Sequence, residues 1–159
     1  MIYNSRKTFS VKRPVRSFRD LEVYQTTLGA SVIVVKDIRP KLAKLKYLLI
    51  AGLTDCAMTI PLLISEAHSI RFGDHKQGLL LLERAMAGCN KMIVYLEQAK
   101  GIYRPAPDIV LPSGGRSRKT FLTNNDRDLI DDLVRRYSDV RTKIFRLEKA
   151  WQKWVEPRR

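Results

Sequence analysis

An uninterrupted apolar seam near the C-terminal end constrains the fold of this chain most strongly. Between residues 130 and 154, large apolar residues recur at intervals of three and four without a gap. This spacing places them along one side of an α-helix and suits the seam of a left-handed helical bundle. The seam consists of Ile130, Leu133, Tyr137, Val140, Ile144, Leu147, Trp151 and Trp154. We expect this helix to begin near Asn125, where four aspartates match the positive end of the helix dipole.

Three further stretches have helical spacing. The first begins at Ser17, which with Asp20 forms a variant of the capping box, and its predicted stripe includes Leu28 and Val32. The second is expected from about residue 41 to 71, after a tight connection "DIRPK" that puts Pro40 in its first turn. The third starts at Asp74, ends at Gly101 and carries two apolar seams, which predicts neighbours on two sides.

These patterns predict an all-α protein, an antiparallel up-down-up-down four-helix bundle. We expect a flexible basic N-terminal arm over residues 1–16, the bundle over 17–156 and a basic tail over 157–159. A Pro/Gly-rich basic loop over 102–122 is long for a compact bundle, which indicates a functional loop or an added extension.

Pro61 lies inside the second predicted helix, in "DCAMTIPLLISEAHSIR", and a proline in a helix interior costs roughly 3 kcal/mol. We expect the carbonyl of Ala57 to be capped by Thr54, Thr59 or water.

Residues 47–65 approach the length of a membrane span, but Asp55 at their centre favours a helix buried in a bundle. For Asp55 itself a structural hydrogen bond is favoured over a functional role.

Enzymatic chemistry finds little support in the residues. The chain has two histidines, His68 and His75, and Glu66-Ala67-His68 has the wrong spacing for a di-iron ligand pair. The segment "PSGGRSRKT" lacks the order of a P-loop. We therefore expect no catalytic residues, no metal and no cofactor.

Cys56 and Cys89 fall in apolar stretches and are expected to be buried free thiols of a cytoplasmic protein.

Charge is the remaining signal. The chain has 30 Lys and Arg against 16 Asp and Glu, a net charge of +14. The arm contributes +5, residues 102–122 contribute +3 and residues 133–159 contribute +6, so the rest of the chain is neutral. Such a distribution suits neutralisation of phosphates, and the alternative is a solvated face that serves solubility. The residues we expect to bind nucleic acid are Arg13, Arg16, Arg116, Arg118, Lys119, Arg135, Arg136 and Arg146.

Two phrases carry a family resemblance. "SFRDLEVYQ" at the first predicted helix and "AMTIPLLISEA" in the second resemble phrases of a four-helix bundle family. That family comprises proteins encoded in ribosomal-RNA intervening sequences and the accessory variability determinant (Avd) proteins of diversity-generating retroelements. The resemblance covers about residues 17–101. Leu63 and Ala67 depart from the family phrase, in which Asn and Gly are usual.

The resemblance implies a homopentameric ring, in which a kink at Pro61 gives each subunit its taper; the alternative is that Pro61 only shapes the core of one subunit. It also implies a non-enzymatic accessory protein that holds a reverse transcriptase together with structured template RNA or cDNA for mutagenic copying, with no membrane partner. A protein-interaction scaffold of the intervening-sequence type, without a nucleic-acid role, is the second hypothesis.

Overall fold

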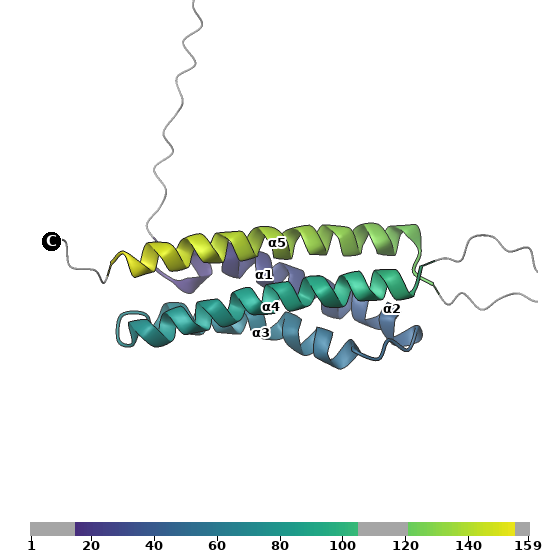
Figure 1. Cartoon of the computed structure of the whole chain (residues 1–159), viewed down its shortest axis with the longest axis horizontal. Coiled ribbons are helices and arrows are strands. Elements are labelled where there is room, and N and C mark those ends of the chain that lie inside the picture. The colour runs from purple at the N-terminus through teal and green to yellow at the C-terminus, as the bar shows by residue number, and fades with distance from the viewer. Residues whose placement is uncertain (1–14, 105–120, 155–159) are drawn as a thin grey trace, which may run out of the picture.

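The computed structural model describes residues 15–104 and 121–154, and all regular structure within these ranges is helical (Figure 1). A short 3-10 turn, η1 (Phe18–Asp20), precedes α1 (Glu22–Ile33), which continues through the π-helical segment η2 (Val34–Ile38) into α2 (Arg39–Lys44). Then follow α3 (Ile50–Ile70), α4 (His75–Ile102) and α5 (Asn124–Gln152). The expected helical bundle of four long helical segments is confirmed for the described residues.

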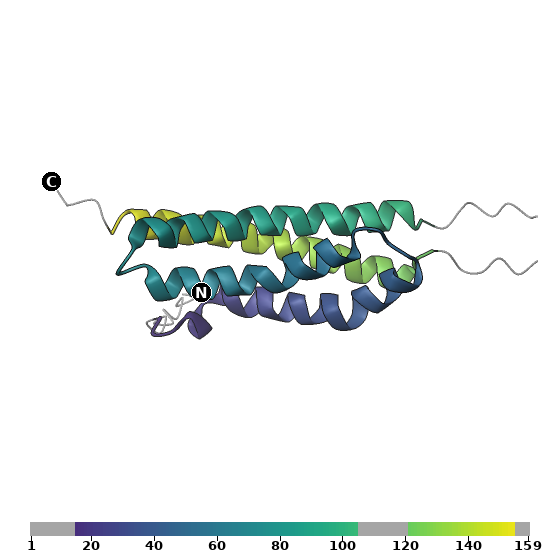
Figure 2. The ribbon, with the colours of Figure 1, turned by 90° about the horizontal axis from the view of Figure 1, so that it is seen from below.

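The helical segments lie side by side along the long axis of the molecule (Figures 1 and 2). Residues 45–49, the end of α4 and the start of α5 lie at one end of the bundle, which we call the loop end. The turn over residues 71–74, between α3 and α4, lies at the other end, which we call the turn end. The last turns of α5 lie at the turn end as well.

The predicted boundary between the first two helices is wrong. The helix passes through Pro40, because the π-turn lets the Arg39 amide donate to the carbonyl of Val34, five residues back, and Pro40 then takes the second position of α2. The chain breaks later, at Lys46, whose φ of 56° is left-handed. The Lys46 amide donates to Ala43 and the Tyr47 amide to Leu42, both at 3.0 Å, which is a Schellman ending without glycine.

The predicted stripe of the first helix also included Leu21, which is buried, but it is wrong at Leu28 and Val32. Leu28 and Val32 are 43% and 47% exposed, whereas Thr27 and Ser31 are buried. Burial of these two hydroxyls is possible because each is satisfied within α1: Thr27 Oγ1 donates to the Val23 carbonyl and Ser31 Oγ to the Leu28 carbonyl, both at 2.8 Å. The core-facing side of α1 therefore consists of Val23, the small Ala30 and the two hydroxyl residues Thr27 and Ser31.

The later helices follow the predicted pattern more closely. The α5 seam is buried from Ile130 to Ile144, and α4 buries residues of both predicted seams. Pro61 is buried inside α3 beside Ile60, where α3 approaches α4 so closely that a Cβ on Gly88 would meet Ile60 Cγ1 at 2.8 Å. The expected cap by Thr54 is wrong, because its hydroxyl donates to the Ile50 carbonyl instead.

Helix α3 passes the length and composition test for a membrane span, which is weak evidence because core helices pass it too. In the described structure its residues Leu53, Ala57, Ile60 and Ile64 are buried in the bundle core. The same helix leaves Met58 and Leu62 exposed.

Capping signals are largely confirmed. Ser17 and Asp20 form the reciprocal capping box, although it caps η1 rather than α1. The Asp74 carboxylate accepts from the Gln77 amide at 3.0 Å and starts α4. Helix α4 does not end at Gly101 but runs one residue further, to Ile102.

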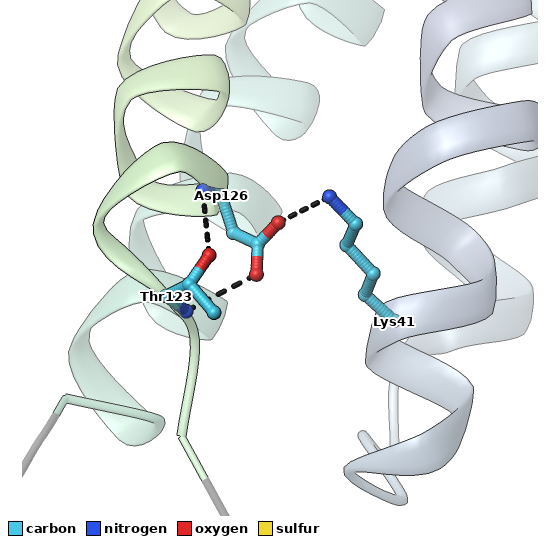
Figure 3. Close-up of polar contacts among 3 residues, drawn as sticks. All are labelled: Lys41, Thr123 and Asp126. Atoms are coloured by element: carbon cyan, nitrogen blue, oxygen red, sulfur yellow. Dashed lines mark hydrogen bonds and ion pairs between the residues drawn. The ribbon is translucent and has the colours of Figure 1, made fainter.

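The start of α5 is held by a contact that sequence spacing did not indicate. Asp126 and Thr123 form a reciprocal capping box, with hydrogen bonds of 3.1 and 3.2 Å, and Asp126 also accepts from Lys41 of α2 (Figure 3). Burial raises the pKa of the Asp126 carboxyl, but the hydrogen bonds from Lys41 and Thr123 outweigh it and hold the pKa below its ordinary value. The contact ties α2 to α5 at the loop end.

Candidate nucleic-acid interface

Four of the eight cations expected to bind nucleic acid lie outside the described residues: Arg13, Arg116, Arg118 and Lys119. The structure describes Arg16, just before η1, and Arg135, Arg136 and Arg146, all on α5. It does not bring these four into one cluster. Arg135 and Arg146 share the outer side of α5, because eleven residues make about three helical turns.

Arg135 and Arg136 are held by one carboxylate. Arg135 Nη2 lies 2.5 Å from Asp132 Oδ1, and Arg136 Nε lies 2.6 Å from Asp132 Oδ2. Burial raises the pKa of Asp132, but the hydrogen bonds from the two arginines outweigh it and lower the pKa, so the carboxylate is ionised at neutral pH. The pair therefore carries a net charge of about one rather than two toward a partner.

Arg16 and Arg146 are both exposed, and neither makes an ion pair with another described residue. At Arg16 it is the backbone that is fixed, since its amide donates to Asp20 Oδ2 at 3.0 Å. Two cations with ordered backbones and free head groups are suited to phosphate contacts.

Charge is polarised along α5. Residues 124–132 contain four aspartates and one arginine, whereas residues 133–154 contain seven Lys and Arg against Asp139 and Glu148. The basic part of α5 is the part that runs toward the turn end, where the colour in Figure 1 changes from green to yellow. This asymmetry follows from the sequence, because acids near a helix N-terminus and bases near its C-terminus both stabilise the helix dipole.

Most cations in the described structure are free of internal pairing. The described residues include 21 Lys and Arg, and five of these make ion pairs of 4.0 Å or less with a described Asp or Glu: Lys41, Lys100, Arg135, Arg136 and Lys143. The remaining sixteen make none with a described carboxylate. The described residues also contain 14 Asp and Glu, so the described part of the chain carries a net charge of +7.

A group of residues at the turn end was missed by sequence reasoning. Arg71, Phe72, His75, Trp151 and Trp154 line a cavity of about 370 Å³. Trp154 was assigned to the buried seam, but α5 ends at Gln152 and Trp154 is 87% exposed. Phe72 lies in the turn, where no periodicity could mark it. The usable signal was the pairing of aromatic residues with cations in "RFGDHK" and "KAWQKW".

Other candidate chemistry is sparse in the part of the chain that the structure describes. No group of three or more His, Cys, Asp or Glu there is placed to hold a metal ion. Cys56 is half-buried and Cys89 is buried, and both are free thiols. Burial raises the pKa of Cys89 to about 12, so its thiol stays protonated. Asp55, for which a structural hydrogen bond was expected, is exposed at a groove between α3 and α4.

The chain matches no protein-family model, no curated protein sequence and no solved structure. The functional proposal therefore rests on the sequence and the structure of this chain alone.

Proposed function

We propose that this protein is a non-enzymatic, nucleic-acid-binding accessory protein of a diversity-generating retroelement. In this proposal it brings a reverse transcriptase and the element's structured template RNA or cDNA together for mutagenic reverse transcription. The observation that carries the proposal is the display of unpaired cations on a helical frame. The resemblance of "SFRDLEVYQ" and "AMTIPLLISEA" to the Avd proteins supplies the retroelement setting.

Phosphate is the ligand that this charge distribution suits best. Sixteen described cations make no internal ion pair, and nine further Lys and Arg belong to residues 1–14, 105–120 and 155–159, against two acids there. Because each phosphate contact releases condensed counterions, many weak cationic contacts together bind a polyanion strongly at low salt. The cations are spread over several elements, which favours recognition of shape and backbone over base sequence.

The proposal includes an antiparallel up-down-up-down subunit that assembles into a homopentameric ring. The chain connections at alternate ends of the bundle support the topology (Figures 1 and 2). Self-association is supported by apolar pairs at i,i+4 spacing on the outside of two helices that contact each other: Leu28 with Val32 on α1, and Met58 with Leu62 on α3. Exposed apolar pairs of this kind suit a protein interface.

The same apolar pairs favour the second candidate, a protein-interaction scaffold of the intervening-sequence type. In that function the outer sides of α1 and α3 would bind protein, and the cations would only keep the chain soluble. The two candidates differ in one measurable property, because the scaffold function requires no binding to phosphate backbones.

A filter-binding titration separates them. The full chain is titrated against a structured RNA and a duplex DNA at about 50 mM and about 200 mM salt. A protein with 6 to 10 phosphate contacts loses roughly 10³- to 10⁵-fold in affinity between these conditions. We expect tight binding at the lower salt and a loss of at least two orders of magnitude at the higher one. No binding at the lower salt would leave the scaffold as the function.

The control is a polyanion without bases. Heparin in large excess of charge competes for purely electrostatic contacts, so it should displace duplex DNA fully. Co-elution with the partner polymerase is then tested with and without the RNA. The accessory role requires a complex of all three, and a polymerase complex that excludes the RNA contradicts it.

A further inference from the structure

The turn end of the bundle combines exposed aromatic rings with cations. Phe72 is 86% and Trp154 87% exposed, the two highest values for aromatic residues in the described structure. A large aromatic side chain left in water forgoes burial of its ring, which is unfavourable unless a ligand covers it. Both rings line the same cavity of about 370 Å³, within the range typical of small-ligand sites.

Arg71 lines this cavity and contacts two of its aromatic rings. Its guanidinium carbon lies 4.1 Å from the centre of the Phe72 ring and 5.4 Å from that of Trp151. The guanidinium donates to the His68 carbonyl at the end of α3 and makes no ion pair with a described carboxylate. A half-buried cation whose charge is not neutralised favours an anionic ligand.

The surrounding charge has the same sign. Residues 71–76 and 148–154 contain Arg71, Lys76, Lys149 and Lys153 against two acids, Asp74 and Glu148. The Glu148 carboxylate is buried and accepts from the Gln152 side-chain amide at 2.9 Å. The Asp74 carboxylate accepts a hydrogen bond from the Gln77 amide at the start of α4. An acidic or phosphorylated ligand is therefore attracted to the cavity, and a basic one is repelled.

A polar atom in the cavity wall has no partner. The His75 side chain lines the cavity, and its Nε2 is buried without a hydrogen-bond partner among the described residues. Because this atom is buried from solvent, it does not face a ligand in the cavity as the structure stands. The site offers aromatic faces for stacking and a cation for phosphate.

We infer that this cavity takes an unpaired base of a single-stranded nucleic acid, stacked on Phe72 and Trp154, with the adjoining phosphate near Arg71. This inference rests on the proposed function, because it names the form of nucleic acid that the turn end binds. Base stacking on aromatic side chains combined with a positive surface is the general mode of single-strand binding. The rest of the basic surface contacts the phosphates of single-stranded and double-stranded nucleic acid alike.

The chain contains its own reporter for this inference. Its only two tryptophans, Trp151 and Trp154, both line the cavity. Tryptophan fluorescence of the full chain, excited near 295 nm, is followed during titration with an eight-nucleotide oligouridylate and with a duplex of equal phosphate content. Stacking quenches tryptophan emission, so we expect strong quenching by the oligouridylate and little by the duplex. Equal emission changes with both ligands would overturn the inference.

Two variants test the stacking residues by fluorescence anisotropy of a labelled oligonucleotide. Phe72→Ala and Trp154→Ala alter exposed side chains, so the fold should remain, as checked by circular dichroism. Each removes one stacking contact, worth about 1–3 kcal/mol by alanine substitution. We expect a loss of roughly five- to 150-fold in single-strand affinity for each, and unchanged duplex affinity. The matched control is Phe121→Ala, an exposed phenylalanine at the loop end, which should change neither affinity.

The outcomes separate this inference from the proposed function. If wild-type protein binds duplex and single strand with a steep salt dependence but Phe72→Ala and Trp154→Ala bind as wild type, the inference is wrong and the proposed function stands. If the wild type binds no nucleic acid, the proposed function is wrong and the inference falls with it. Quenching by polyglutamate equal to that by the oligonucleotide would assign the cavity to an acidic peptide and overturn the inference.

Discussion

Tyr137 is a fully buried side chain whose hydroxyl has no hydrogen-bond partner among the described residues. Burial raises the pKa of its phenol above the ordinary value, so the hydroxyl stays protonated at any physiological pH. An unpaired buried hydroxyl is unfavourable, because in the unfolded chain it binds water.

We expect Tyr137→Phe to leave the free energy of unfolding unchanged or to raise it by about 1–2 kcal/mol, since the substitution removes only the unpaired oxygen. Urea denaturation followed by circular dichroism measures this. A loss of more than about 1 kcal/mol would show that the hydroxyl has a partner in solution.

His68 predicts a pH dependence of stability. It is buried, and burial followed by the nearby charge of Arg71 lowers its pKa below the ordinary 6.5, partly opposed by Asp20. The unfolded chain therefore takes up a proton near pH 6.5 while the folded protein does so only at lower pH. This contribution to stability is fully present above pH 6.5 and is lost as the pH falls from there through the lower pKa of His68 in the folded protein.

Urea denaturation at pH 7.5 and pH 5.5 tests this on wild type and His68→Gln. The variant should lose less stability between the two pH values than the wild type does. His75→Gln keeps His68 and serves as the matched control, with the wild-type loss expected. An equal loss in wild type and His68→Gln would contradict the account of this residue.

At the scale of elements, the contact between α2 and α5 is the clearest test of how the bundle is held at the loop end. Lys41 donates to Asp126, whose side chain is largely buried (Figure 3). Lys41→Met leaves that carboxylate without its cation, and hydrogen bonds to charged groups contribute about 1.5–3 kcal/mol. Since Lys41 is half exposed, we expect the lower part of that range to be lost in urea denaturation.

Lys44→Met is the control for this prediction, because Lys44 lies on the same short helix, is exposed and makes no ion pair with a described residue. It should change stability by less than about 0.5 kcal/mol. Equal effects of the two substitutions would mean that the pair contributes nothing.

Two glycine substitutions should change stability in opposite directions, because α3 and α4 approach closely at Gly88 whereas Gly29 has open space around it. Gly88→Ala would press a Cβ against Ile60 beside Pro61, and overpacking costs typically about 1–3 kcal/mol. Gly29→Ala on α1 meets nothing within 4 Å and should gain up to about 1 kcal/mol from helix propensity. Thermal unfolding of both variants measures the difference. Stabilisation by Gly88→Ala would contradict the packing described here.

Whether the core-facing side of a helix could be predicted depended on which residues occupy it. The α5 seam was readable because its core positions are large and apolar at unbroken three-four spacing. On α1 the core positions include Thr27 and Ser31, whose hydroxyls bond to their own backbone, while the apolar Leu28 and Val32 point outward. Apolar spacing alone therefore selected the wrong side. The break at Lys46 was hidden because a lysine, not a glycine, takes the left-handed conformation.

Of the candidate site, only the positive charge could be predicted from the sequence. Arg16 and Arg146 could be named as free cations, but the Asp132 carboxylate that binds both Arg135 and Arg136 becomes evident only once the side chains are placed. Nor could the turn-end cavity be predicted, since Phe72 and Trp151 come from segments about eighty residues apart.

At the scale of the whole molecule, the Asp132 carboxylate offers a way to raise nucleic-acid affinity. Asp132→Asn frees Arg135 and Arg136 for phosphate, and a surface ion pair is worth up to about 1 kcal/mol, so affinity should rise by up to roughly fivefold. Asp139→Asn removes the same charge from α5 at a residue without an ion pair to a described cation, and should have a smaller effect. Filter binding at one fixed salt concentration compares them, and equal gains would show that only net charge matters.

The central claim is that unpaired cations of the bundle contact phosphates. The most direct measurement is the slope of log affinity against log salt for a structured RNA, compared between wild type and Arg146→Gln. Each lost phosphate contact reduces the slope by about 0.7 on a single strand and about 0.9 on a duplex. The account predicts a steep wild-type slope and a shallower one for Arg146→Gln by about that amount, whereas a flat wild-type slope would contradict it.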